Sequence, residues 1–230
     1  MICITGDTHR DFRRVAALCD TVKSNNDDIL IVLGDAGINY FGRAKDVVLK
    51  HELAELPITL LCIHGNHEQR PESIPTYAEI DWNGGSVYVE SDFPSLLFAK
   101  DGEVYELAGK RYLALGGAYS VDKPLRLANQ WGWWADEQPS DEIKHRIAKR
   151  LEAENWNVDV VLSHTCPFRY IPRETFLSCI DQSGVDNSTE VWLGEIEERL
   201  AYNWWYCGHY HTNKTIDKLR FLFQDVLELR

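Results

Sequence analysis

The chain has 230 residues, of which 44% are hydrophobic and 26% charged, and its formal net charge at pH 7 is −12. This length suits one large domain with a sizeable buried core, so we expect a single domain over residues 1–230. The acidic balance argues against binding of long nucleic acid, because neutralising a phosphate backbone requires clustered Lys and Arg.

Membrane and export signals are missing from the sequence pattern. No run approaches the roughly 20 apolar residues that a spanning helix needs. The first strand pattern begins at Ile2, which leaves no room for a signal peptide. The six cysteines include no Cys-x-x-Cys pair, so we expect reduced thiols. These features favour a cytoplasmic protein that does not bind membranes.

The first quarter of the chain alternates between strand and helix patterns. Short β-branched runs alternate with stretches whose apolar residues recur at helical spacing. This alternation is typical of parallel βαβ units. The predicted strands are 2–5, 29–33 and 58–63, and the predicted helices are 11–24 and 42–55.

The rest of the chain is less regular. Asp/Gly turn signals separate four short strand patterns that read as hairpins. The stretch 120–139 is predicted to be irregular, and we expect its residues Trp131, Trp133 and Trp134 to pack it against the sheets, with a lid as the alternative. The remaining predicted strands are 85–89, 95–99, 103–107, 111–115, 158–162, 203–207 and two or three within 213–229, and the remaining predicted helices are 140–155 and 189–201.

Metal-ligand residues follow five of the apolar strand runs. In an α/β sheet, ligands bind beyond the carboxyl ends of the strands, so these residues are expected to meet in one site. The stretches are Gly6-Asp7-Thr8-His9, Gly34-Asp35, Gly65-Asn66-His67, Ser163-His164 and Gly208-His209-Tyr210-His211.

Seven of these side chains suit metals of the first transition row. Seven ligands exceed the roughly four to six that one ion takes, and they suit two ions that share a bridging carboxylate. Asp35 or Asp7 would be that bridge, and their spacing alone leaves both open. The seven candidate ligands are Asp7, His9, Asp35, Asn66, His164, His209 and His211.

The charges of such a site favour an anionic substrate. Two divalent ions and two carboxylates leave about two positive charges before any hydroxide binds. A metal pair roughly 3.5–4 Å apart also lowers the pKa of a bridging water and holds both the attacking and the leaving oxygen. Hydrolysis of a phosphate ester is therefore expected, although amidohydrolase-type reactions stay open on the ligand chemistry alone.

The ordered set Asp-x-His, Gly-Asp, Gly-Asn-His-Glu, His and Gly-His-x-His resembles the calcineurin-like metallophosphoesterase family. The resemblance covers residues 5–212. It implies an α/β fold, a four-layer α-β-β-α sandwich of two mixed sheets flanked by helices. It also implies that one metal takes Asp7, His9 and His211, that the other takes Asn66, His164 and His209, and that Asp35 bridges them.

The same resemblance gives His67 a catalytic role without metal binding, as an electrophile or an acid for the leaving oxygen. Protein serine/threonine phosphatases of this superfamily carry an Asp that orients this histidine, and Ile38 stands at that position here. We therefore expect a lower pKa for His67 and a less fixed ring. Arg10, which follows the Asp-x-His motif, is a candidate phosphate contact or a solvated surface group. Arg126 is a weaker candidate for contact with substrate charge.

The sequence thus predicts a metal-dependent phosphoesterase acting on small phosphorylated mono- or diesters, with a metal-bridging hydroxide as the nucleophile. Manganese is the first choice for the two divalent ions, and iron, zinc, cobalt and nickel also accept these ligands. The alternatives are a catalytically weak interaction scaffold that keeps the fold, and a nuclease or nucleotide or cyclic-nucleotide phosphodiesterase.

Overall fold

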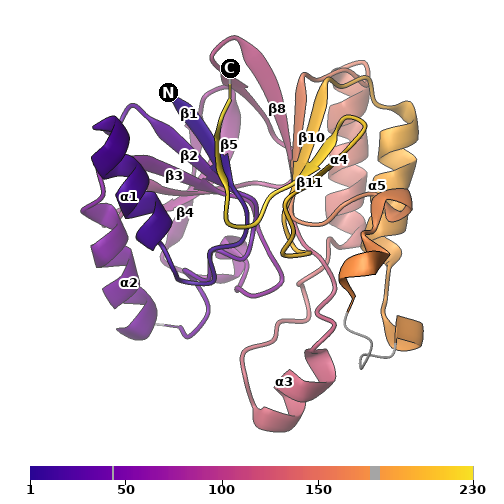
Figure 1. Ribbon diagram of the computed structural model, residues 1–230, viewed down its shortest axis with the longest axis horizontal. Helices are drawn as coiled ribbons and strands as arrows, with labels where there is room; N and C mark the ends of the chain where they lie inside the picture. Colours follow the sequence, from indigo (N-terminus) through magenta and orange to yellow (C-terminus); the bar gives the residue numbers. More distant parts are fainter. Residues whose placement is uncertain (43, 177–181, 230) are drawn as a thin grey trace.

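The computed structural model describes residues 1–42, 44–176 and 182–229. Its helices and strands form four layers, with two helices, a seven-stranded sheet, a six-stranded sheet and two further helices in succession (Figure 1). Both sheets contain parallel and antiparallel pairs. The expected four-layer α-β-β-α sandwich is confirmed.

The seven-stranded sheet is built around the βαβ units expected near the N-terminus. Strands β1, β2, β3 and β6 are parallel neighbours, and the hairpin of β4 and β5 extends one edge. The C-terminal strand β13 closes the other edge antiparallel to β1. In spatial order the strands are β13 (Val226–Glu228), β1 (Ile2–Thr5), β2 (Ile29–Val32), β3 (Thr59–Cys62), β6 (Leu96–Ala99), β5 (Gly85–Glu90) and β4 (Tyr77–Trp82).

The six-stranded sheet has a parallel centre and antiparallel edges. Strands β8, β9, β10 and β12 run parallel, while β7 and β11 pair antiparallel with β8 and β12. The chain crosses from the first sheet to the second between β6 and β7. In spatial order the strands are β11 (Lys214–Ile216), β12 (Leu219–Phe221), β10 (Trp204–Cys207), β9 (Val160–Ser163), β8 (Lys110–Leu115) and β7 (Val104–Leu107).

Each sheet is covered by helices on its outer face. Helices α1 (Arg13–Val22) and α2 (Ala44–Ala54) pack on the first sheet, and α4 (Asp141–Ala153) and α5 (Ser188–Arg199) pack on the second. A fifth helix, α3 (Lys123–Asn129), lies apart from these layers at the lower end of the sandwich in Figure 1. Four short 3-10 helices cover Pro71–Ser73, Phe168–Tyr170, Arg173–Thr175 and Gln182–Gly184.

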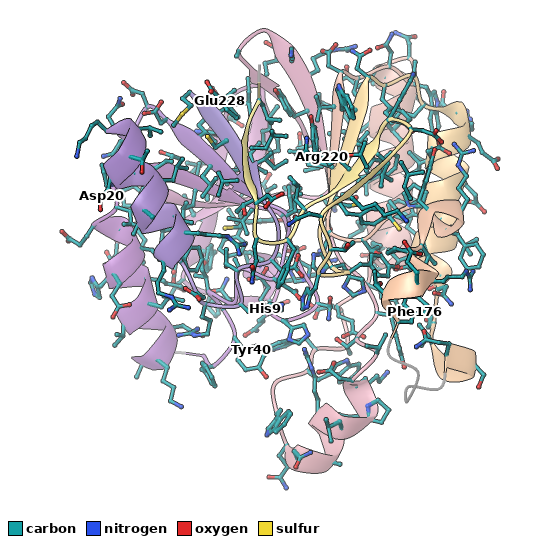
Figure 2. All side chains as sticks on the ribbon, viewed as in Figure 1. His9, Asp20, Tyr40, Phe176, Arg220 and Glu228 are labelled. Carbon is teal, nitrogen blue, oxygen red and sulfur yellow. The ribbon has the colours of Figure 1, made fainter. Side chains whose placement is uncertain are left out.

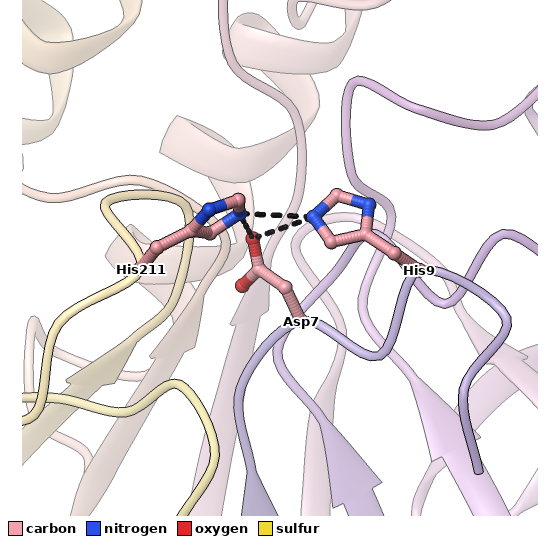
Figure 3. A group of neighbouring side chains, drawn as sticks. All are labelled: Asp7, His9 and His211. Atoms are coloured by element: carbon pink, nitrogen blue, oxygen red, sulfur yellow. Dashed lines mark hydrogen bonds and ion pairs between the residues drawn. The ribbon is translucent and has the colours of Figure 1, made fainter.

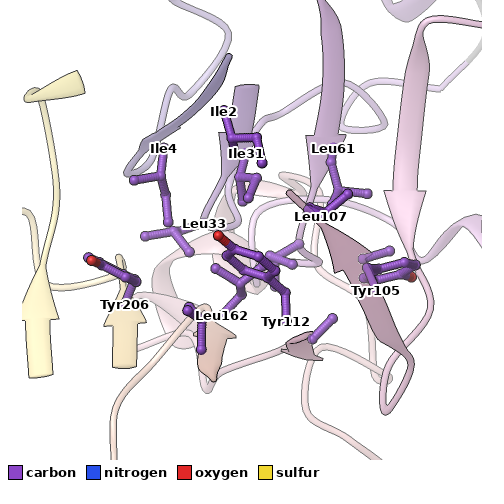
Figure 4. Packing of buried hydrophobic residues seen from close by; sticks show 14 of the residues in the cluster. Ile2, Ile4, Ile31, Leu33, Leu61, Tyr105, Leu107, Tyr112, Leu162 and Tyr206 are labelled. Atoms are coloured by element: carbon purple, nitrogen blue, oxygen red, sulfur yellow. The ribbon is translucent and has the colours of Figure 1, made fainter. Parts of the chain in front are cut away.

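The central core lies between the two sheets. Residues that alternate along the strands, such as Ile31 and Leu61 of the first sheet and Tyr112 and Leu162 of the second, meet there and are buried (Figure 4). Burying apolar surface on both sides stabilises the parallel strands, which leave no face for water. Polar residues are therefore expected only past the strand ends.

Two elements differ from the sequence prediction. Strand β4 was not predicted because four of its six residues are exposed and its pattern lacks a buried face. Helix α3 lies inside the stretch predicted to be irregular, and Trp131 beside it is 53% exposed, so packing of that side chain against the sheets was wrong. Trp134 instead contacts the ring of Tyr40 edge-on.

Other expectations concern cysteines and membranes. The described cysteines are buried and form no disulfide, and Cys179 lies outside the described residues. Within the described part of the chain, no helix combines the length and apolar character needed to cross a bilayer.

Candidate metal centre

The carboxyl ends of five parallel strands deliver the candidate ligands to one edge of the sandwich. Asp7 follows β1, Asp35 follows β2 and Asn66 follows β3, while His164 and His209 follow β9 and β10 of the other sheet. The packed sheets fix these strand ends relative to each other, which gives a rigid base for a polar site. In Figure 2 the edge is marked by His9, below the strands.

The backbone at this edge turns sharply. His9, Asp35, His209 and His211 all have left-handed conformations, with φ of 45°, 49°, 65° and 48°. Such conformations cost of order 1–3 kcal/mol each in non-glycine residues and cluster at functional sites. The strain is held by the buried strands, and it aims each side chain back toward the centre of the edge.

Two motif glycines allow the loops to approach the carboxylates. A Cβ atom on Gly65 would lie 2.1 Å from Asp35 Oδ1, and one on Gly208 would lie 2.2 Å from Asp7 Oδ1. Both distances are far below van der Waals contact, so any side chain would displace a carboxylate. The glycine before Asn66 and the glycine before His209 are thus required by close packing at the site.

We name Asp7, His9 and His211 the open half-site (Figure 3). Their ligand atoms lie close enough to hold one ion, with Asp7 Oδ2 at 3.2 Å from His211 Nε2 and 3.7 Å from His9 Nε2. The two histidine side chains are 49% and 33% exposed. Among the described residues, Asp7 Oδ2 is a buried oxygen with no hydrogen bond of ordinary geometry. A cation between these atoms would satisfy it.

We name Asn66, His164 and His209 the buried half-site. His164 Nε2 lies 2.8 Å from Asn66 Oδ1, and the rings of His164 and His209 are 5.0 Å apart. His164 Nδ1 donates to the Leu33 carbonyl oxygen at 2.8 Å, which places the ring proton on Nδ1. The lone pair of Nε2 is then free to bind a metal, as expected of a ligand oriented by its second nitrogen.

Asp35 lies between the two half-sites. Its Oδ1 is 3.4 Å from His164 Nε2, and its Oδ2 is 3.9 Å from His9 Nε2. One oxygen therefore faces each half-site. Asp7 contacts the buried side only through its Oδ1, which accepts the backbone N–H of His209 at 2.9 Å. The geometry favours Asp35 as the bridge over Asp7, a choice that the sequence left open.

The electrostatics of the cluster suit cation binding. Burial alone would raise the pKa of Asp7 and of Asp35, but the neighbouring histidines hold both pKa values below the ordinary range, with the hydrogen bond from His211 the largest of these effects on Asp7. Burial lowers the pKa of His209 to about 3, so its ring stays neutral. The hydrogen bond to Asp7 raises the pKa of His211. Two carboxylates and neutral imidazoles are thus available as ligands.

Glu68, the last residue of the Gly-Asn-His-Glu motif, supports the loops from behind. Its side chain is fully buried and accepts the backbone N–H groups of Gly65 at 3.2 Å and Gly37 at 3.0 Å. It therefore ties the loop after β3 to the loop after β2. Burial, together with the charge of Asp35, raises the pKa of Glu68 to about 8.

His67 lies beside the cluster with its two ring nitrogens in different surroundings. Nε2 faces the site, 4.0 Å from Asp35 Oδ2, while Nδ1 contacts the guanidinium of Arg126. Burial lowers the pKa of His67, and the positive charge of Arg126 adds to that effect, while Asp35 opposes it. The expected direction is confirmed, but the expectation of a poorly fixed ring was wrong because Arg126 takes the place of the absent carboxylate.

The other candidate cations bind elsewhere. Arg10 Nη1 donates to Asp46 Oδ1 at 2.7 Å and to the Gly37 carbonyl oxygen at 2.6 Å, and its guanidinium lies over the Phe41 ring. Binding of phosphate by Arg10 stays a prediction, and it would require the side chain to leave this ion pair. Ile38, at the position of the missing orienting carboxylate, is fully buried.

A cavity of about 530 Å³ opens above the cluster. Apart from the metal-ligand residues, its walls are apolar or acidic, with Phe176 and Val185 on one side and Asp122, Asp186 and Glu190 around the rim. No Lys or Arg is found among the described residues that line it. The positive field needed for an anionic substrate must then come from bound cations.

Comparisons with known proteins identify the family. A model of calcineurin-like phosphoesterases matches residues 1–213. A search of curated proteins found no significant match.

Two solved structures share the general outline. One is a protein of unknown function from Aquifex aeolicus, 14% identical, covering 88% of this chain and 87% of its own, with a TM-score of 0.36. The other is phosphopantetheinyl hydrolase from Mycobacterium tuberculosis, 15% identical, covering 96% of this chain and 87% of its own, with a TM-score of 0.42. Similarity at this level carries no information on substrate.

The match to the family model spans most of the chain and includes every strand end that supplies a candidate ligand. The chain therefore belongs to the calcineurin-like phosphoesterase family, a metal-dependent family, and is a hydrolase of phosphate esters.

Proposed function

We propose that this protein hydrolyses small phosphate esters at a centre of two divalent metal ions. Asp7, His9 and His211 would hold one ion, and the buried half-site would hold the other, with Asp35 shared between them. The observation that carries the proposal is the position of Asp35, whose two carboxylate oxygens face different half-sites. A single ion would leave one set of converging ligands without a partner.

Bound divalent ions would lower the pKa of a coordinated water and neutralise phosphate charge in the transition state. The protein residues supply the rest. The strained turns hold the ligands in place before substrate binds, which avoids reorganisation during the reaction. His67 Nε2 faces the same cavity and is placed to donate a hydrogen bond to a phosphate or leaving-group oxygen.

The cavity supports a particular kind of substrate. Its volume of about 530 Å³ suits a small molecule or the end of a chain. Its acidic rim would repel further phosphate groups away from the metal ions, and Phe176 and Val185 offer apolar contact. We infer that the preferred ester carries one phosphate and an uncharged, partly apolar leaving group.

Manganese is our first choice of metal. The ligand set contains imidazole nitrogens, carboxylates and one amide oxygen, and it lacks the thiolates that would select softer ions. Iron, zinc, cobalt and nickel fit the same ligands, so availability in the cell would decide among them.

The test is metal-dependent hydrolysis by the full-length protein. After removal of metal by a chelator, p-nitrophenyl phosphate and bis-p-nitrophenyl phosphate are assayed with and without added Mn²⁺, and bound metal is measured by elemental analysis. We expect turnover of at least one ester that requires Mn²⁺. No turnover of either ester by protein shown to contain two metal ions would contradict the proposal. Comparing p-nitrophenyl phosphate with nucleoside triphosphates tests the acidic rim.

A further inference from the structure

Arg126 is buried although it lies on the helix that extends from the body of the molecule. Its exposed fraction is 1%, whereas its neighbours Leu125 and Leu127 on α3 are more than half exposed. Burying an arginine is costly unless its donors are all paired. The position of this side chain therefore needs an explanation beyond the packing of α3 (Figure 1).

The Arg126 guanidinium joins α3 to the loop that carries the catalytic histidine candidate. Nε donates to Asp122 Oδ2 at 2.9 Å, within α3 and its cap. Nη1 donates to the carbonyl oxygens of Asn66 at 3.3 Å and Gly132 at 3.2 Å. Nη2 contacts His67 Nδ1. Each nitrogen of the group thus has a partner, and two of the partners belong to residues 66–67.

The contact with Nδ1 fixes the position of the proton on the His67 ring. A guanidinium has donors and no acceptor, so Nδ1 must accept with its lone pair. In a neutral imidazole the single ring proton then lies on Nε2. Since Nε2 is the nitrogen that faces Asp35 and the cavity, His67 presents an N–H to the site.

His164 shows the opposite arrangement in the same site. Its Nδ1 donates to the Leu33 carbonyl oxygen, so its Nε2 presents a lone pair to the cluster. His67 Nε2 also lies close enough to His9 and Asp35 to complete a third group of potential metal ligands. What separates a ligand from a donor here is the partner of Nδ1, a carbonyl oxygen for His164 and a guanidinium for His67.

We propose that Arg126 is a positioning residue that holds His67 in the tautomer with the proton on Nε2. In that state His67 donates a hydrogen bond to the bound phosphate ester and does not bind metal. This inference rests on the proposed function, and it assigns to α3 the role that an orienting carboxylate has in related phosphatases. Ile38, which occupies the carboxylate position here, has no polar side-chain atom to offer.

The first test needs no activity. Nitrogen-15 NMR of histidine side chains, recorded on metal-free protein and on protein loaded with diamagnetic Zn²⁺, reports which ring nitrogen carries the proton. His67 signals are assigned by loss in His67→Gln. We expect the Nε2–H form in both states. A proton on Nδ1, or zinc bound to Nε2 of His67, would overturn the inference whether or not the protein is an esterase.

The second test uses substitutions of Arg126. Arg126→Lys keeps a cationic donor, and Arg126→Met keeps much of the volume without any donor. We expect Arg126→Met to populate both His67 tautomers and to lower kcat by about 10–100-fold, as removal of a supporting hydrogen bond does at metal sites. KM should change little. Arg126→Lys should keep the Nε2–H form and recover most of the lost rate.

A matched control separates this role from general loosening of the segment 120–139. Arg70 is also buried, is ion-paired with Asp101 at 2.6 Å, and donates to the Asp136 carbonyl oxygen at the far end of that segment. Arg70→Met should reduce thermal stability while leaving the His67 tautomer unchanged. Equal tautomer shifts in Arg70→Met and Arg126→Met would contradict a specific role for Arg126. Absence of turnover in the wild type with the Nε2–H form present would instead count against the proposed function.

Discussion

The open and buried half-sites differ in how they are held. In the buried half-site, His164 is completely enclosed, and its second nitrogen is fixed by a backbone carbonyl of β2's loop. In the open half-site, His9 and His211 are partly exposed, and their Nε2 atoms approach each other to 2.9 Å. Two ring nitrogens facing each other at this distance share a position that a cation would take.

This difference suggests different metal affinities. Ligands that are already oriented lose little conformational entropy when an ion binds, whereas exposed side chains must be ordered at that moment. The buried half-site should thus hold its ion tightly, and the open one should exchange its ion with solvent. The predictions below test whether the two half-sites can be separated.

The largest effect is expected for Asp35→Asn, which removes the carboxylate that links the half-sites. Both ions should be lost, and turnover should fall by about 10³-fold or more, because each ion contributes several kcal/mol of transition-state stabilisation. Metal content after dialysis against metal-free buffer gives the stoichiometry. Retention of one tightly bound ion would show that Asp35 does not bridge.

Substitution of one histidine in each half-site compares them directly. His211→Ala should lose only the exchangeable ion, so excess Mn²⁺ should restore much of the activity. His164→Ala should lose the tight ion and resist rescue. It should also cost about 1–3 kcal/mol of stability, because the Leu33 carbonyl oxygen is left buried without its donor. Metal titration followed by turnover and thermal unfolding measures both effects.

His145→Ala is the control for this pair, because His145 lies on the exposed face of α4, away from the site. It should change neither metal content nor rescue. If excess Mn²⁺ restored His164→Ala as readily as His211→Ala, the two half-sites would be equivalent and the comparison would fail.

His67→Ala asks whether a third histidine belongs to the open half-site. We expect both ions to remain and turnover to fall by about 10²–10⁴-fold, the range for loss of a proton-donating group. The loss should be greatest for esters with poor leaving groups, which depend most on a donor. Elemental analysis of the variant decides the point, since a missing ion would make His67 a ligand.

The smallest effect concerns pH and Glu68, behind the buried half-site. The pKa of Glu68 is about 8 in the folded protein against 4.5 for an ordinary glutamate, so only the unfolded chain ionises between these values. Stability present at low pH is therefore lost as the pH rises from 4.5 to about 8. Glu68→Gln does not titrate, so its stability relative to the wild type should increase over that range.

Thermal unfolding of metal-free protein at pH 5 and pH 8 measures this difference. In a protein of this size 1 kcal/mol shifts Tm by about 2–4 °C, so the Tm of Glu68→Gln relative to the wild type should rise by at least that amount between the two pH values. A difference that stays constant with pH would show that Glu68 is ionised in the folded protein.

The regular part of the fold could be predicted from sequence because its signals are local. Residues 2–63 show the strand and helix periods that their burial requires, and the structure has the three strands and two helices expected there. Strand β4 and helix α3 lack such a period, since β4 is largely exposed and α3 spans only seven residues. Their existence depends on hairpin pairing and on the burial of Arg126.

The site was predictable to a similar degree and for a related reason. Candidate ligands such as Asp7 and His164 directly follow buried strands, so the parallel topology alone brings them to one edge. The contact between Arg126 and His67 joins segments 59 residues apart through a helix without a sequence period. The Asp122–Arg126 spacing of four residues was the only local sign, and it is common on ordinary helices.

A crystal structure grown with Mn²⁺, with data collected at a wavelength where manganese scatters anomalously, tests the two-ion centre most directly. We predict two anomalous peaks about 3.5–4 Å apart. One should lie among Asp7, His9 and His211, the other should lie between Asn66 and His164, and Asp35 should contact both. A single peak, or two peaks without a shared Asp35, would contradict the proposed centre.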